Sequence, residues 1–110
     1  MRSPEDILRS IRAEVEERQA FREGGLTLSG LAERCDTNRT YVSVVLQERF
    51  GGFFAYINAC RLAFAAQYHE QHPYASVAEI ARAAGFRSRQ SYYNALHRRE
   101  GATGTACDRG

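Results

Sequence analysis

The sequence predicts an all-α fold in which two similar helical units are joined by one long helix. Proline occurs only twice in the 110 residues, and apolar and polar residues do not alternate over any long stretch, so strands are not expected. One pattern of apolar and polar residues occurs twice, and between its copies apolar residues recur every three or four positions. A chain of this length has room for one domain with a modest core.

The duplicated pattern covers residues 28–51, LSGLAERCDTNRTYVSVVLQERFG, and residues 77–101, VAEIARAAGFRSRQSYYNALHRREG. Each copy is predicted to be a short amphipathic helix, a tight turn and a second helix that begins at a polar cap. This is the layout of a helix-turn-helix unit. Two such units on one chain suggest that the protein binds a nucleic-acid duplex at two places. The aligned pairs are Leu28 and Val77, Leu31 and Ile80, Ala32 and Ala81, Cys35 and Ala84, and, after one extra residue in the second copy, Val42 and Tyr92, Val45 and Ala95, Leu46 and Leu96, and Gly51 and Gly101.

The segment before the first copy is predicted to be one helix over residues 3–23. Ser3 can cap it, Pro4 fits its first turn, and Asp6 completes a capping box. Gly24 and Gly25 end it. Its buried face is expected to be an apolar stripe at helical spacing: Ile7, Leu8, Ile11, Val15 and, by extension, Phe21.

The later helices are predicted from their caps. Thr27 caps a helix over 28–35, Asp36 or Thr37 opens a helix over 38–49, and Gly51 follows its end. A long helix over 53–71, roughly 28 Å in length, ends before Pro73.

The second copy is predicted from similar signals. Ser76 and Glu79 form a second capping box, whose helix runs to Ala84. Gly85 suits a left-handed turn, and Ser88 caps a last helix to about residue 100. The expected divisions within the single domain are an N-terminal helix (1–25), a first helix-turn-helix (26–52), a linker helix (53–73), a second helix-turn-helix (74–103) and a loose tail (104–110).

The charge of +2 is small, but its distribution is uneven. All fifteen basic residues are arginine, whose planar guanidinium suits phosphate groups and guanine edges. Residues 1–35 hold six arginines and seven acidic residues, whereas residues 36–110 hold nine arginines and six acidic residues. Residues 82–99 contain five arginines and no acidic residue, which favours an anionic partner without excluding an ordinary solvated helix face.

Several functional classes are not expected. The three cysteines, an odd number without CxxC spacing, favour neither a disulfide framework nor zinc, and Cys35 and Cys60 occupy apolar helix positions. His69 and His72 are three apart, which does not match the HExxH zinc motif. No apolar run is long enough to cross a membrane and no signal peptide is recognisable, so a cytoplasmic protein is expected. No catalytic arrangement or glycine-rich phosphate loop is present, so neither an enzyme nor a cofactor is expected.

The second helix of each copy carries the candidate DNA-binding residues. Arginine pairs with guanine, asparagine and glutamine pair with adenine, and hydroxyl groups contact bases or phosphates. The aromatic side chains of the long helix, among them Phe53 and Phe54, are assigned mainly to packing. The candidates are Asn38, Arg39, Thr40, Ser43 and Gln47 in the first copy, and Arg87, Ser88, Arg89, Gln90, Tyr93, Asn94 and His97 in the second.

Residues 26–103 resemble the DNA-binding domain of the AraC/XylS family of bacterial transcription regulators. The most specific part is IARAAGFRSRQSYYNALHRREGAT over 80–103, which resembles the signature of the family's second unit, and LAERCDTNRTYVSVVLQERFG resembles its first. The matching positions in the second unit are Ile80, Ala81, Gly85, Phe86, Ser91, Tyr92, Gly101 and Thr103, and those in the linking helix are Tyr56, Ile57, Arg61 and Ala65.

The resemblance implies seven helices, with two homeodomain-like units on one rigid linker helix and both recognition helices in successive major grooves of DNA. It implies that Arg39, Thr40 and Ser43 of the first unit, and Arg89, Gln90 and Asn94 of the second, face bases or the backbone. The implied partner is double-stranded promoter or operator DNA, with RNA polymerase and a sensing or dimerisation domain as further candidates.

The sequence departs from the family pattern at two places. Thr103 is followed by Gly104, and Cys107 and Asp108 replace the expected packing residue and its basic neighbour, so the family's C-terminal clasp is in doubt here. Val44 lies where many members carry a basic residue, which predicts that the first unit binds DNA more weakly than the second. These departures and the low net charge leave a second interpretation open, a helical protein-interaction module of the same fold that has lost DNA binding.

Overall fold

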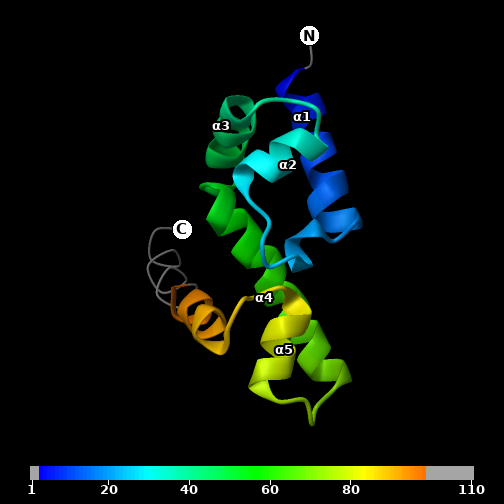
Figure 1. The fold of residues 1–110 in the computed structure, drawn as a ribbon, viewed down its shortest axis with the longest axis vertical. Helices are drawn as coiled ribbons and strands as arrows, with labels where there is room; N and C mark the ends of the chain where they lie inside the picture. Colours follow the sequence, from blue (N-terminus) through cyan, green and yellow to red (C-terminus); the bar gives the residue numbers. More distant parts are fainter. Residues whose placement is uncertain (1–2, 99–110) are drawn as a thin grey trace.

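The structure is a computed structural model that describes residues 3–98. These residues form helices and connecting turns, with no strand among them (Figure 1). The predicted all-α class is therefore confirmed for this part of the chain. The principal-axis extents are 48 × 32 × 21 Å, so the molecule is longer in one direction than in the others.

The N-terminal segment is three short helical pieces and not the single helix predicted over 3–23. These pieces are α1 (Pro4–Arg12), the π-helical turn η1 (Ala13–Glu17) and the 3₁₀ turn η2 (Ala20–Arg22). The predicted capping box is present, since the Ser3 hydroxyl accepts from the Asp6 amide while the Asp6 carboxylate accepts from the Ser3 amide. The helix is interrupted at Gln19, whose φ of 59° is left-handed.

Contacts with the second half of the chain explain this interruption. The Arg61 Nε donates to the Phe21 carbonyl oxygen at 2.6 Å, and its terminal nitrogen donates to the Glu23 carbonyl oxygen at 2.9 Å. Ala20 and Phe21, which follow the left-handed Gln19, are buried. These tertiary contacts outweigh the helical propensity of the segment, which is only a weak local preference.

The next two helices, α2 (Leu28–Arg34) and α3 (Arg39–Phe50), pack against each other. The predicted cap of α2 is confirmed, because the Thr27 hydroxyl accepts from the Gly30 amide at 3.0 Å. The predicted cap of α3 is wrong. Asn38, and neither Asp36 nor Thr37, caps α3, and its side-chain oxygen accepts from the Tyr41 amide at 3.0 Å.

The long helix α4 (Phe53–Gln71) has the bounds that the sequence predicts. Gly51 and Gly52 precede it with φ values of 82° and 123°, a region that L side chains rarely adopt, so this pair makes the sharp turn between α3 and α4. The helix packs against α3, η2 and α5 (Val77–Ala84). Because it contacts elements from both halves of the chain, α4 determines how those halves are placed.

The last described elements also follow the sequence prediction closely. The Ser76 hydroxyl caps α5 by accepting from the Glu79 amide at 3.1 Å. The predicted capping box is only half formed, because the Glu79 carboxylate accepts from the Tyr68 hydroxyl at 3.0 Å and not from the Ser76 amide. Residues 89–98 are helical, and the Ser88 hydroxyl accepts from the Ser91 amide at 3.1 Å. The predicted end of this helix near residue 100, Gly101 and the tail lie outside the described residues.

Two hydrophobic clusters hold the helices together. The first cluster joins α1, α2, α3 and the start of α4, and it includes the predicted stripe, of which Leu8 is only partly buried. The second joins the middle of α4, α5 and the helix over 89–98. Phe64 of α4 packs against both clusters. The helix α4 thus contributes to both clusters and connects the two groups of helices.

The local backbone repeats where the sequence repeats. The Thr37 amide donates to the Ala32 carbonyl oxygen at 3.0 Å, and at the aligned position the Phe86 amide donates to the Ala81 carbonyl oxygen at 2.9 Å. At the aligned turn position the backbone is left-handed in both copies, with a φ of 54° at Asp36 and 103° at Gly85. Each turn leads to a polar cap and the next helix.

Among residues 3–98, no helix has the length and apolar character that crossing a bilayer requires.

Candidate nucleic-acid interface

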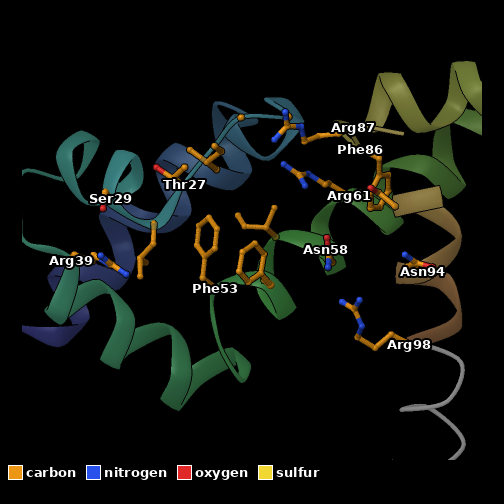
Figure 2. A pocket seen from close by; sticks show the side chains of 17 residues that line it. Thr27, Ser29, Arg39, Phe53, Asn58, Arg61, Phe86, Arg87, Asn94 and Arg98 are labelled. Carbon is orange, nitrogen blue, oxygen red and sulfur yellow. The ribbon is translucent and has the colours of Figure 1, made fainter. Parts of the chain in front are cut away.

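A hollow of about 810 Å³ lies between the two groups of helices (Figure 2). It is lined by the start of α3, the first three turns of α4, the loop before α2 with the first turn of α2, and the turn and helix over 86–98. In Figure 1 the helix over 89–98, drawn in orange, and α3 both lie to the left, while α1 lies to the right. The hollow therefore opens between the two helices that carry the predicted DNA-binding residues.

Four arginines line the hollow, and no acidic residue is among its described lining residues. Arg39 comes from the first turn of α3, Arg61 from α4, Arg87 from the turn after α5, and Arg98 from the last described helix. Figure 2 shows Arg39 at one end and the other three at the opposite end, with Phe53 between them. The arrangement concentrates positive charge at one concave surface, where an anion would gain most.

The ion pairs of the described chain lie elsewhere. Five arginines pair with carboxylates: Arg9 with Asp6, Arg12 with Glu16, Arg18 with Glu14, Arg34 with Glu23, and Arg49 with Glu5. None of these five lines the hollow, and no arginine of the hollow has an acidic partner within residues 3–98. The positive charge of the hollow is thus not neutralised by the described part of the chain.

Arg61 differs from the other three because it is also a structural residue. It is half buried, and burial lowers the pKa of its guanidinium from the usual value, although arginine stays charged at neutral pH. Besides its hydrogen bonds to the Phe21 and Glu23 carbonyl oxygens, its guanidinium lies 5.8 Å from the centre of the Phe86 ring. Arg61 thus links α4 to η2 and also supplies positive charge to the hollow.

The segment around η2 is wedged between α4 and the turn after α5. A Cβ on Gly85 would lie 2.5 Å from the Phe21 carbonyl oxygen and 2.6 Å from the Arg22 Cα, so only glycine allows this approach. The Arg22 Nε donates to the Ala83 carbonyl oxygen at 2.8 Å, and its guanidinium lies 4.4 Å from the centre of the Phe64 ring. These contacts fix the second group of helices relative to the first.

Every candidate residue predicted from the sequence is exposed, but the hollow brings together only three of them. Arg39, Arg87 and Asn94 line it. The others lie on exposed helix positions outside it: Asn38, Thr40, Ser43, Gln47, Ser88, Arg89, Gln90, Tyr93 and His97.

Some candidate side chains are engaged in local hydrogen bonds. The Asn38 oxygen is occupied by its cap of α3, and the Ser88 hydroxyl caps the last helix and lies 3.1 Å from the Ser91 hydroxyl. The Gln90 side-chain nitrogen donates to the Asn94 side-chain oxygen at 2.9 Å. Asn38 and Ser88 therefore serve mainly as caps, while the free amide hydrogens of Gln90 and Asn94 stay on the exposed face.

The sequence prediction missed four residues of this surface: Phe54, Asn58, Arg61 and Arg98. Phe54 was assigned to packing, but it is 72% exposed. Its position one residue after Phe53, and hence about 100° around the helix, was the signal that only one of the two can face the core. Arg98 was visible as part of the arginine-rich stretch, but its place beside Arg87 depends on the tertiary structure.

No group of three or more histidine, cysteine or carboxylate side chains within residues 3–98 could hold a metal ion. Burial raises the pKa of the Cys60 thiol to about 11.

Comparisons of the chain with protein-family models, with curated proteins and with solved structures found no match.

Proposed function

We propose that this protein binds double-stranded DNA in a sequence-specific manner, as the DNA-binding domain of an AraC-type transcription regulator. In this proposal α2 and α3 form one helix-turn-helix, α5 and the helix over 89–98 form the other, and α4 is the linker. The helices that begin at Arg39 and Arg89 enter successive major grooves on one face of the duplex. Promoter or operator DNA is the partner.

The observation that carries the proposal is the set of four arginines in the hollow. They come from both proposed units and from the linker, and they have no carboxylate partner among residues 3–98. Phosphate contacts from such residues supply most of the salt-dependent affinity of proteins for DNA. The salt dependence of binding distinguishes this role of the arginines from contacts with an ordinary protein surface.

Two further features support the proposal. The two turns repeat the same hydrogen bond and the same left-handed residue, as two copies of one motif would. The longest extent of 48 Å also exceeds the roughly 34 Å between successive major grooves on one face of DNA, so a molecule of this size can span them. Once one unit is bound, the second binds intramolecularly and gains from effective concentration.

Specificity is assigned to the exposed side chains of the two proposed recognition helices. On the first, Thr40, Ser43 and Gln47 lie on the same exposed face as Val44, at spacings of three or four residues. On the second, Arg89 and Asn94 are suited to guanine and adenine. The first face is uncharged, so the first unit is expected to contribute less phosphate binding than the second.

A salt titration of binding to duplex DNA tests the proposal. Affinity should fall steeply with added salt, with log K decreasing by about 0.9 per phosphate contact for each unit of log salt. Arg87→Ala and Arg98→Ala should each reduce this slope by about one contact, whereas Arg9→Ala, which removes an ion-paired arginine of α1, should leave it unchanged. Absence of salt-sensitive binding would favour the alternative, a helical protein-interaction module of this fold.

A further inference from the structure

The exposed side chain of Phe54 is not explained by packing. It is 72% exposed, whereas its neighbour Phe53 packs against the first hydrophobic cluster. Among the described residues the only ring it contacts is that of Phe53, edge-on, with centroids 5.2 Å apart and planes at 72°. A large apolar side chain that is held outside the core gains little from the folded structure itself.

The backbone holds Phe54 in a defined position. It is the second residue of α4, directly after the turn made by Gly51 and Gly52. A Cβ on Gly52 would lie 3.3 Å from the Gln47 side-chain oxygen, so this turn also approaches α3 closely. The Phe54 side chain therefore projects from the first turn of a helix whose start is set by the glycine turn and by its approach to α3.

Phe54 lines the hollow, together with the four arginines that have no acidic partner in the described chain. An exposed apolar ring in a cationic hollow is suited to an occupant that is anionic at its edges and apolar inside. Double-stranded DNA fits this description, because the phosphates lie along both edges of a groove and the base faces lie within the stack.

The position of Phe54 between the proposed recognition helices selects the minor groove. Two successive major grooves on one face of B-DNA are separated by a minor groove, which would lie opposite the hollow when both units are docked. Minor-groove-binding proteins frequently insert phenylalanine, leucine or isoleucine between base pairs, which unstacks one step and kinks the duplex.

On these grounds, and resting on the proposed function, we infer that Phe54 is a wedge that enters the minor groove between the two half-sites and unstacks one base step. Arg39 and Arg98, at opposite ends of the hollow, bind phosphates on either side of the opened step. The kinked duplex presents its convex face to the protein, and the hollow of about 810 Å³ receives that face. The protein thereby deforms its site as well as binding it.

The wedge also predicts specificity at base pairs that no side chain contacts by hydrogen bonds. Pyrimidine–purine steps such as TA and CA are the easiest to unstack. Sites selected from random duplexes by the protein should therefore carry such a step between the two half-sites. Sites selected by Phe54→Ala should lose this enrichment while keeping the same half-sites.

The direct test uses the full chain and a selected duplex in which 2-aminopurine replaces adenine at each central step in turn. Unstacking raises the fluorescence of this base, so the wild-type protein should produce a rise at one central step. Phe54→Ala should abolish the rise and Phe54→Leu should retain it, since leucine is also a known wedge. Tyr74→Ala, which removes another exposed aromatic ring far along the chain, is the matched control and should retain the rise.

Binding is measured by fluorescence anisotropy on the same samples. The test therefore distinguishes failure of the wedge from failure of DNA binding itself. A rise that persists in Phe54→Ala, or no rise at any central step with the wild-type protein fully bound, would overturn the wedge and leave DNA binding in place. A protein that binds no duplex at all would overturn both.

Discussion

Arg22 and Ala83 are joined by a hydrogen bond across 61 residues of sequence, in which the arginine Nε donates to the alanine carbonyl oxygen at 2.8 Å. Arg22 belongs to η2, which follows the N-terminal helix, while Ala83 lies in the last turn of α5. The bond therefore links the two groups of helices directly, in addition to their common attachment to α4. In the proposed function, this link sets the angle between the two recognition helices.

Arg22→Ala should loosen that angle. Loss of the hydrogen bond is expected to lower the free energy of unfolding by about 1 kcal/mol, because the group is exposed and water replaces part of the bond. Affinity for a two-part DNA site should fall, whereas affinity for a single half-site should not, as measured by fluorescence anisotropy. Arg82→Ala is the control, because it removes the same charge from a side chain that makes no hydrogen bond within residues 3–98. If both variants lose affinity for the two-part site equally, the link plays no part in placing the units.

Gly85→Ala should destabilise the protein strongly. The backbone φ of 103° disfavours any L side chain, and the new Cβ would overlap the Phe21 carbonyl oxygen and the Arg22 Cα. We expect a loss of about 2–4 kcal/mol in the free energy of unfolding, measured by urea denaturation. Gly25→Ala is the matched control, because nothing lies within 4 Å of its added Cβ. Similar denaturation midpoints for the two variants would show that the close approach at Gly85 does not exist in solution.

Arg89→Ala tests the second recognition helix. If Arg89 contacts a guanine, its removal should cost about 1–3 kcal/mol of binding free energy and relax the preference at one base pair. A competition assay over a panel of single-base variants of the selected site measures both effects. Unchanged affinity and preference would remove Arg89 from the set of base-contacting residues.

Val44→Arg tests the weaker grip expected of the first unit. Val44 is 49% exposed on the outer face of α3, so an arginine fits there without disturbing the core. The variant should bind DNA more tightly and increase the salt slope by about 0.9 for one new phosphate contact. Val44→Gln, polar but uncharged, should show no such increase in slope. An unaltered slope in Val44→Arg would place this face of α3 away from the phosphates.

Local sequence signals predicted much of the fold. The bounds of α4, the caps at Thr27, Ser76 and Ser88, and the left-handed Gly85 all follow from interactions within a few residues of each other. Such signals are strong because capping and glycine turns depend on side-chain chemistry and φ alone. The choice among Asp36, Thr37 and Asn38 failed because three adjacent residues can all cap a helix, and Asp36 occupies the left-handed turn instead.

The long-range features could not be predicted from the sequence. The N-terminal helix breaks at Gln19 because Arg61, some forty positions later, takes up the carbonyl oxygens of Phe21 and Glu23. The exposure of the candidate DNA-binding residues could be predicted from helical periodicity. The hollow between the two groups of helices could not. It exists only because the tertiary structure places Arg39 opposite Arg87 and Arg98.

The central claim, that two recognition helices bind one face of the duplex together, is tested most directly by changing the spacing of a selected site. Affinity is measured for the selected duplex and for the same duplex with about five base pairs, half a helical turn, inserted between its halves. The insertion rotates one half-site to the opposite face, so affinity should fall to that of a single half-site. Equal affinity for the two duplexes would contradict the account.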